Sequence, residues 1–245
     1  MENSENKSLI STGSSNLAKT EKLLFITQKI LSEIKPKYES VRIGNQEWMT
    51  RNLDVDRFRN GDLITHIESD EDWKKAGENG QPAWCYYDND PVNYRKYGKL
   101  YNWFAVNDPR GLAPIGWHVP SDEEWTSLRE FLGKDSGLKM KSVNDWIKWD
   151  YYLGINPNGD NSSGFNALPG GYRYSDGFYH SRRVSEFWCT TEYTIEDDFT
   201  STMNYNLDSE FDCLVPSHHY DDLMYRGASV RCIIDCHILK NNNFF

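Results

Sequence analysis

Two short runs of carboxylate and amide side chains could bind a calcium ion. Calcium takes about six to eight oxygen ligands, which are often supplied by loops. Asp and Asn also stabilise turns by bonding to nearby backbone groups, and neither run matches an EF-hand loop. The sequence favours turn chemistry and leaves calcium as the alternative cofactor. The candidate calcium ligands are Asp88, Asn89 and Asp90 in the first run and Asn158 and Asp160 in the second, beside Asn156 and Asn161.

Aromatic, histidine and acidic side chains toward the C-terminus could bind a ligand. Rings give a large contact area at low entropy cost, and sugars stack on rings while bonding to carboxylates and amides. About half of the rings between Phe187 and Arg226 are expected in the core, Trp188 above all. The predicted partner is a glycan or a protein. The candidate ligand-binding residues are Tyr205, Phe211, His218, His219, Tyr220, Asp221, Asp222 and Tyr225, with 218–222 the most exposed run.

No known catalytic motif is present in the sequence. The G-x-S-x-G, H-E-x-x-H and P-loop patterns are absent, and the carboxylates are too numerous to nominate a catalytic pair. His118 lies in GWHVP and is expected to be a structural imidazole beside a helix start. Cys232, Cys236 and His237 resemble half of a zinc site, but the other half is missing. We therefore predict a protein without catalytic residues or zinc.

The composition restricts the partners of the chain. It has 245 residues and a formal net charge of -10, whereas nucleic acids and anionic lipids bind cationic surfaces. No apolar run approaches the roughly 18 residues of a membrane-spanning helix, and no leader is visible. We expect neither nucleic-acid binding nor membrane insertion. The 9 Trp, 15 Tyr and 11 Phe indicate a core built largely on rings with polar handles.

Residues 1–40 are predicted to form an extension, disordered at first and then helical. Residues 1–16 are rich in Ser, Asn, Lys and Glu, which is typical of disorder. Three roles are open to the helical part of the extension: packing on the domain, connecting the domain to another part, or joining copies of the chain into a homo-oligomer. The sequence favours the first two roles. Pro36 ends the predicted helix over 17–34, whose apolar face holds Leu23, Ile26, Ile30 and Ile34.

Residues 41–236 are predicted to form one domain, followed by a tail at 237–245. A hairpin is expected at 41–49, and Ser121 with Glu124 forms a capping box for a helix that Gly133 stops. Few helices, short strands and long loops indicate an α+β fold. The buried face of the capped helix is expected to hold Trp125, Leu128, Phe131 and Leu132. Further expected elements are a short helix that is capped by Ser69 with Asp72, runs through Trp73 to Ala76 and is stopped by Gly77, a helix at 99–106, a turn at 108–111, and strands at 187–191, 201–207 and 228–234.

An ordered series of motifs resembles one known family. The series is IGNQEWMTRNLDV, RNGDLI, WCYYDND, YGKLYNWFAV, GLAPIGWHVPSDEEW, GFNALPGGYR, FWCTTE and GASVRCIID. From Val41 to about Asp235 it is similar to the Fibrobacter succinogenes major paralogous domain family. That family is similar in turn to formylglycine-generating domains, with WHVPSDEEW corresponding to their LPTEAEW helix start and SVRC to their FRC strand. The resemblance implies a loop-rich, C-type-lectin-like variant of the α+β class.

The resemblance also implies a role in recognition or adhesion. Family members are usually secreted proteins or lipoproteins on bacterial surfaces, and related folds of phages and gut bacteria contact ligands through C-terminal loops. Here neither a leader nor a lipobox is visible, so the compartment stays open. A structural or assembly role through residues 17–34 is the alternative.

The cysteines test two further implications of the resemblance. Formylglycine-generating enzymes bind copper through two cysteines a few residues apart, whereas Cys189 and Cys213 are far apart in this sequence. Oxidase activity is therefore disfavoured. Cys85 and Cys232 both lie in family-like segments, and in an exported protein we expect them to form a disulfide.

Overall fold

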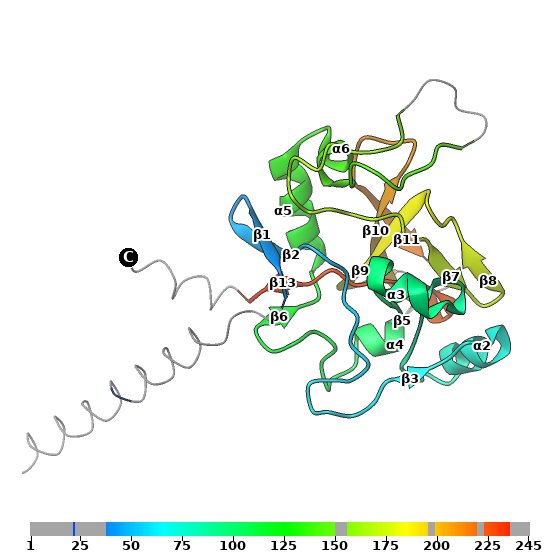
Figure 1. Ribbon diagram of the computed structural model, residues 1–245. Coiled ribbons are helices and arrows are strands. Elements are labelled where there is room, and N and C mark those ends of the chain that lie inside the picture. The colour runs from blue at the N-terminus through cyan, green and yellow to red at the C-terminus, as the bar shows by residue number, and fades with distance from the viewer. Residues whose placement is uncertain (1–21, 23–37, 150–155, 196–198, 220–222, 236–245) are drawn as a thin grey trace, which may run out of the picture. The chain divides into compact units, whose positions relative to one another are not determined.

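The computed structural model describes Lys22 and residues 38–149, 156–195, 199–219 and 223–235 (Figure 1). The chain divides into two units, Met1–Tyr38 and Glu39–Phe245, and the helices and strands from β1 to β13 belong to the second. Lys22 is helical, but the predicted disorder over 1–16, the rest of the predicted helix over 17–34 and the predicted tail lie outside the described residues. No described helix is long and apolar enough to cross a membrane.

A four-stranded antiparallel sheet joins the beginning and the end of the domain. Strand β1 (Ser40–Ile43) pairs with β2 (Gln46–Met49), β2 pairs with β13 (Ile233–Ile234), and β13 pairs with β6 (Trp117–His118). The predicted hairpin at 41–49 is confirmed. Its turn requires glycine, because Gly44 has a φ of 61°.

The larger sheet has nine strands, in the order β11-β10-β9-β12-β5-β4-β3, with the hairpin β7–β8 attached to β12. Strand β12 is parallel to β9 and β3 is parallel to β4, whereas the other pairs are antiparallel. The strands are Thr65–His66 (β3), Ala83–Cys85 (β4), Leu100–Asn102 (β5), Tyr172–Tyr174 (β7), Gly177–Tyr179 (β8), Val184–Ile195 (β9), Phe199–Asp208 (β10), Val215–His219 (β11) and Gly227–Ser229 (β12).

The predicted strands at 187–191 and 201–207 are confirmed as parts of β9 and β10. The predicted strand at 228–234 is wrong in one respect, since it is divided between β12 and β13 in two different sheets. In between, the carbonyls of Val230 and Cys232 accept from the backbone N–H groups of Leu53 and Met49. These bonds carry the chain from the large sheet to the small one.

The helices are short and connect the strands. Ser69 caps α2 by accepting from the backbone N–H of Asp72 at 3.1 Å, as predicted, but the helix continues beyond Gly77 to Glu78. The bounds are Asp70–Glu78 (α2), Pro91–Tyr97 (α3), Trp103–Val106 (α4), Asp122–Leu132 (α5) and Ser136–Met140 (α6), with 3-10 turns at Tyr87–Asn89 (η1) and Leu223–Tyr225 (η3).

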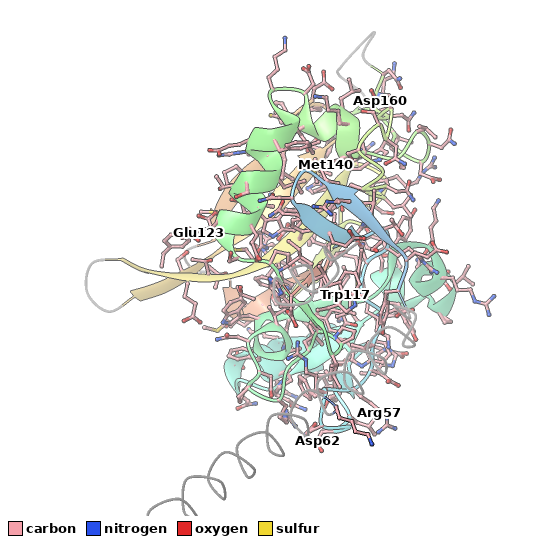
Figure 2. All side chains as sticks on the ribbon, turned by 90° about the vertical axis from the view of Figure 1, so that its left-hand side faces the viewer. Arg57, Asp62, Trp117, Glu123, Met140 and Asp160 are labelled. Atoms are coloured by element: carbon pink, nitrogen blue, oxygen red, sulfur yellow. The ribbon has the colours of Figure 1, made fainter. Side chains whose placement is uncertain are left out.

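The main core lies between α5 and one face of β9 and β10. Trp125 of α5 stacks on Tyr205 with ring centroids 5.2 Å apart and lies 5.5 Å from the ring of Phe187. Figure 2 shows α5, with Glu123 labelled in its first turn, alongside these two long strands. The abundance of aromatic residues in the sequence is thus explained in part by a core of packed rings.

The ends of α5 confirm the local prediction, and its buried face confirms most of it. Ser121 and Glu124 form the capping box, and Gly133 follows the helix with a φ of 77°. Phe131 was expected to be buried but is 65% exposed. Its ring lies over Gly44 in the β1–β2 turn. A Cβ atom added to that glycine would lie only 3.0 Å from the ring. The expected core members Trp125, Leu128 and Leu132 are buried.

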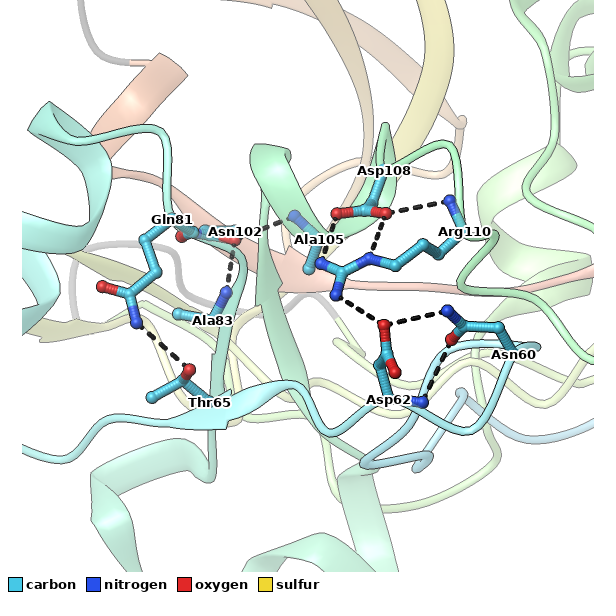
Figure 3. Close-up of polar contacts among 9 residues, drawn as sticks. All are labelled: Asn60, Asp62, Thr65, Gln81, Ala83, Asn102, Ala105, Asp108 and Arg110. Carbon is cyan, nitrogen blue, oxygen red and sulfur yellow. Dashed lines mark hydrogen bonds and ion pairs between the residues drawn. The ribbon is translucent and has the colours of Figure 1, made fainter.

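The predicted helix over 99–106 is wrong in its first half, where the chain forms β5. Asn102 makes the change of structure. Its side-chain oxygen accepts from the backbone N–H groups of Ala83 and Ala105 at 2.9 and 3.0 Å, and its Nδ2 donates to the carbonyl of Gln81 at 2.8 Å (Figure 3). The amide of Asn102 therefore both ends β5 and caps α4. Residues 100–102 pair in the sheet even though the spacing of apolar residues over 99–106 is that of a helix.

The predicted turn at 108–111 is confirmed and is fastened by ion pairs. Arg110 donates from Nε and Nη2 to the two carboxylate oxygens of Asp108, both at 2.8 Å, and from Nη1 to Asp62 at 3.1 Å (Figure 3). The hydrogen bonds from Arg110 hold the pKa of Asp108 below its usual value. These bonds account for a surface turn and indicate no binding site.

Candidate functional site

The candidate site begins with the alternation of side chains along β9 and β10. Successive residues of a strand point to opposite faces. Phe187 and Tyr205 contact Trp125 of α5, so we call their side of the two strands the inner face. Glu186 and Asn204 point to the opposite side, the outer face. Both are buried although they are polar, with 1% and 0% of their surface exposed.

A buried ion pair forms the base of the site on the outer face. Arg226, which follows η3, donates from Nη1 to both carboxylate oxygens of Glu186, at 2.8 and 2.6 Å. Asn204 Nδ2 also donates to Glu186. Burial by itself lowers the pKa of Arg226, but the charge of Glu186 outweighs burial and leaves that pKa raised. Burial raises the pKa of Glu186, and the charge of Arg226 opposes that rise. The two side chains are thus fixed against each other in the interior.

Half-buried rings surround the ion pair. The Arg226 guanidinium lies 4.7 Å from the ring centroid of Tyr172 and 4.5 Å from that of Tyr174, whose hydroxyl accepts from Nη2 at 2.7 Å. Tyr179 stacks on Tyr172 at 5.8 Å, and His180 meets Tyr172 edge to face at 5.4 Å. The rings come mainly from the β7–β8 hairpin, which lies on the side of β9 and β10 away from α5 (Figure 1).

Trp149 extends the row of rings beyond the hairpin. It meets His180 at 5.0 Å, the Arg183 guanidinium lies 4.5 Å over its ring, and its Nε1 donates to Asp208 at 3.4 Å. We call the rings of Trp149, Tyr172, Tyr174, Tyr179 and His180, together with Glu186, Asn204, Asn206 and Arg226, the aromatic–polar site.

Several buried polar atoms of this region have no hydrogen-bond partner among the described residues. They are Asn204 Oδ1, Asn206 Oδ1, Arg226 Nε and Arg183 Nε. Buried polar atoms in proteins are nearly always bonded to protein or to ordered water, so each exception needs a cause. Two amide oxygens and two guanidinium N–H groups near the half-buried rings are therefore left without a protein partner among the described residues.

The protonation states suit neutral polar ligands. Burial lowers the pKa of His180, so its imidazole is neutral at pH 7 and both accepts and donates a hydrogen bond. Burial also raises the pKa of Tyr172, which keeps its hydroxyl protonated. Rings for stacking, with fixed donors and acceptors between them, are the chemistry that binds a sugar or another flat polar group.

The comparisons with known proteins place the domain in a family. Residues 41–233 match the Fibrobacter succinogenes major domain. The chain belongs to this family. The matched region begins within β1 and ends within β13, so it contains β2, β6 and all strands of the larger sheet. Neither the curated proteins nor the solved structures include a match to the chain.

Within this Fibrobacter succinogenes major domain, the predicted ligand-binding residues are scattered. Tyr205 is 1% exposed on the inner face, and its hydroxyl donates to Asp122. Phe211 is 51% exposed in the loop after β10, and Tyr225 is half-buried in η3. The backbone of 218–219 belongs to β11. The remaining predictions, Tyr220, Asp221 and Asp222, lie outside the described residues.

The β7–β8 hairpin of the domain was not among the predicted elements. The segment YRYSDGFYH carries three tyrosines and a histidine around a turn with Asp176 and Gly177. An Asp-Gly pair between alternating aromatic residues predicts a hairpin, and that signal was available. The pairing of Glu186 with Arg226 had no such signal, because the two residues are 40 positions apart.

Most of the candidate calcium ligands of the domain hydrogen-bond to the backbone, whereas Asn89 Oδ1 has no partner among the described residues. Asp90 Oδ1 accepts from the backbone N–H of Val92 at 2.9 Å, and Asn89 Nδ2 donates to the carbonyl of Glu68 at 2.7 Å. The other oxygens that accept from backbone N–H groups are those of Asn156, Asn158, Asp160 and Asn161. Positive φ values at Asp88, Asn89 and Asn161 also fit turn chemistry. No group of three or more His, Cys, Asp or Glu among the described residues could hold a metal ion.

The described cysteines are free thiols, and the expected disulfide between Cys85 and Cys232 is not formed. Both are buried at separate places, Cys85 in β4 and Cys232 just before β13. Burial raises the pKa of Cys85 to about 11 and that of Cys232 to about 12. Burial likewise raises the pKa of Cys189 to about 11, so this thiol is protonated at neutral pH.

His118 has the structural position that its sequence context predicted. Its Nε2 lies 2.8 Å from Glu124 at the start of α5, and its Nδ1 lies 2.7 Å from Asp235 after β13. Burial lowers the pKa of His118, but the two carboxylates outweigh burial and leave it raised. The imidazole thus links α5 to the end of the domain.

Proposed function

We propose that this domain is a non-catalytic recognition module that binds a glycan at the aromatic–polar site. The observation that carries the proposal is the buried Glu186–Arg226 pair under half-buried rings, with two amide oxygens left without partners. Sugar rings present apolar faces that stack on aromatic side chains, and their hydroxyls need directional donors and acceptors. A protein ligand would require a wider contact surface than this group of residues offers.

We further propose that the α+β arrangement is C-type-lectin-like. The pairing of β2 with β13, which brings the two ends of the domain together, and the ordered motifs along the chain support this proposal. The same resemblance supports adhesion at a bacterial surface as the setting in which recognition is used.

A glycan array probed with the full chain tests the function. We expect binding to fall about tenfold or more in Tyr179→Ala, because this variant removes a ring of the site. Phe211→Ala is the matched control, since it removes an exposed ring outside the site. The melting temperature of each variant shows whether the fold is retained.

Two results would contradict the proposal. One is the absence of glycan binding by the wild-type chain, and the other is an equal loss in Phe211→Ala and Tyr179→Ala. Repeating the array with calcium and with a chelator tests the calcium prediction separately, because a dependence on calcium would point to the loops of Asp88 and Asp160.

A further inference from the structure

Three arginines are buried in the described part of the domain, and they differ in their counter-charges. Arg173 pairs with Asp70 at 2.9 Å, and Arg226 pairs with Glu186 at 2.6 Å. Arg231 is 1% exposed, and no carboxylate among the described residues forms an ion pair with it. A buried charge without a counter-charge is costly, so this exception calls for an explanation.

Arg231 is held by neutral hydrogen-bond acceptors and by the ring of Phe165, whose centroid lies 4.4 Å from the guanidinium carbon. Its Nε and Nη2 donate to Asn52 Oδ1 at 2.9 and 2.7 Å, and its Nη1 donates to the carbonyls of Met49 and Phe165 at 3.0 and 2.6 Å. These bonds fix the side chain but do not neutralise it. One N–H of Nη2 has no acceptor among the described residues, since a guanidinium carries five such donors. Burial lowers the pKa of Arg231 to about 9, so the group remains charged at neutral pH.

Arg231 lines a cavity of about 300 Å³. The other cations of its lining are Arg51, Arg95 and Lys96. The carboxylate of the lining, Asp145, is paired with Lys96 at 2.5 Å. Cations thus outnumber carboxylates in this cavity, although the whole chain has a formal net charge of -10.

The surroundings of Arg51 leave it available to a ligand. Its Nη2 donates to the carbonyl of Arg95 at 2.9 Å, and among the described residues no carboxylate pairs with it. Asn166, also in the lining, has a φ of 55° and is half-buried, which places another amide at the cavity. A concave site with several cations and a low-dielectric wall concentrates anions.

We propose that this cavity binds an oxyanion group, a carboxylate or a sulfate, with Arg231 at its base and Arg51 at its rim. The guanidinium fork matches two oxygens of either group, and the anion supplies the counter-charge that Arg231 lacks. A volume of about 300 Å³ is at the lower end for ligand sites, which suits a small acid or one charged sugar unit. The proposal does not depend on glycan binding at the aromatic–polar site.

Isothermal titration of the full chain with inorganic sulfate, sodium glucuronate and glucose tests this site. We expect saturable binding of sulfate or glucuronate, none of glucose, and weaker binding as sodium chloride is added. Sulfate binding without glucuronate binding identifies a site for the free ion, and the reverse identifies one for an acidic sugar. Arg51→Gln should weaken the affinity about tenfold, because it removes a charged donor from an otherwise unchanged fold.

The matched control is Arg57→Gln, because Arg57 is also exposed and also bonds to a single backbone carbonyl, that of Gly61. It should bind the anion like the wild type, and so should Tyr179→Ala, which alters the aromatic–polar site. Arg231→Met is a second variant, expected to abolish binding if its melting temperature shows that it folds. An unchanged affinity in Arg51→Gln, equal binding of glucose, or no saturable binding up to about 10 mM would overturn the proposal.

Discussion

The two faces of β9 and β10 carry side chains of opposite character on the same two strands. On the inner face, Phe187 and Tyr205 pack against α5 in a core of rings. On the outer face, Glu186 and Asn204 are equally buried but polar. Because strand side chains alternate with a period of two, each strand supports the fold with one set of residues and a site with the other.

The faces also differ in how completely their polar atoms are bonded. On the inner face, the Tyr205 hydroxyl donates to Asp122 at 2.5 Å, and Trp125 Nε1 donates to the carbonyl of Trp188 at 3.3 Å. On the outer face, the side-chain oxygens of Asn204 and Asn206 have no partner among the described residues. The inner face has an exception of its own, because Ser185 Oγ, on the same side of β9 as Phe187, has no partner among the described residues. The contrast is therefore one of degree: the two amide oxygens of the outer face leave more hydrogen-bonding capacity unused there.

The largest expected effect comes from the inner face. Phe187→Ala removes a fully buried ring from the contact with Trp125, so we expect the free energy of unfolding to fall by about 3–5 kcal/mol. Urea denaturation measures it. Phe211→Ala, in an exposed position, should cost less than about 1 kcal/mol. Equal losses in the two variants would remove the distinction between core and surface rings.

The second prediction concerns the ion pair of the outer face. Glu186→Gln leaves the buried Arg226 without a carboxylate, and we expect a loss of about 3 kcal/mol in the free energy of unfolding. Glu192→Gln is the control on the same strand, because Glu192 is exposed and should matter by about 0.5 kcal/mol or less. Adding Arg226→Met to Glu186→Gln should restore much of the loss. A double variant less stable than the single one would contradict this account.

The third prediction is a dependence on pH at the start of α5, which covers the inner face. Because the pKa of His118 is raised in the folded protein, the protonated imidazole stabilises the fold fully below about pH 6.5. This stabilisation is lost as pH rises through the raised pKa. Burial raises the pKa of Glu124, but the bonds from His118 and Ser121 outweigh burial and lower it. The Glu124 contribution is therefore lost as pH falls through its lowered pKa.

Comparison of wild type with His118→Gln across pH measures this effect. The difference in unfolding free energy should be about 1 kcal/mol near pH 6 and should shrink toward pH 9. A difference that grows with rising pH would show that the imidazole stabilises α5 in its neutral form.

The smallest expected effect on stability again concerns the outer face. Asn206→Ala removes an amide whose buried oxygen has no partner, so the free energy of unfolding should change by less than about 0.5 kcal/mol or rise. Glycan binding should nevertheless weaken. A clear loss of stability would mean that Asn206 belongs to the structural framework, and the contrast between the faces would fail there.

The sequence predicted the elements whose signals are local. The capping box of Ser121, the cap at Ser69 and the hairpin at 41–49 depend on residues within a few positions of one another. The prediction of a helix over 99–106 failed because Asn102 bonds to Ala83 in β4 and to Gln81 just before that strand. The prediction that Phe131 is buried was wrong because its ring lies over Gly44, which is distant in the sequence.

The sites were harder to predict than the elements. The local sequence around Tyr205 does not distinguish it from an exposed tyrosine. Only its stacking on Trp125 makes it a core residue. The rings of β7 and β8 could have been found from the hairpin sequence, but not the ion pair beneath them. A list of aromatic residues does not reveal which of them share a face.

The sequence by itself determined the family, the α+β class, the first and last turns of α5 and the aromatic character of the core. These properties follow from residues close together in the chain or from the order of motifs. The tertiary structure alone decided that Arg226 has a carboxylate partner, Glu186. It also decided that Arg231, five positions later, has no carboxylate partner among the described residues. The partners of a buried charge come from distant segments, and their identity depends on how the sheets bring those segments together.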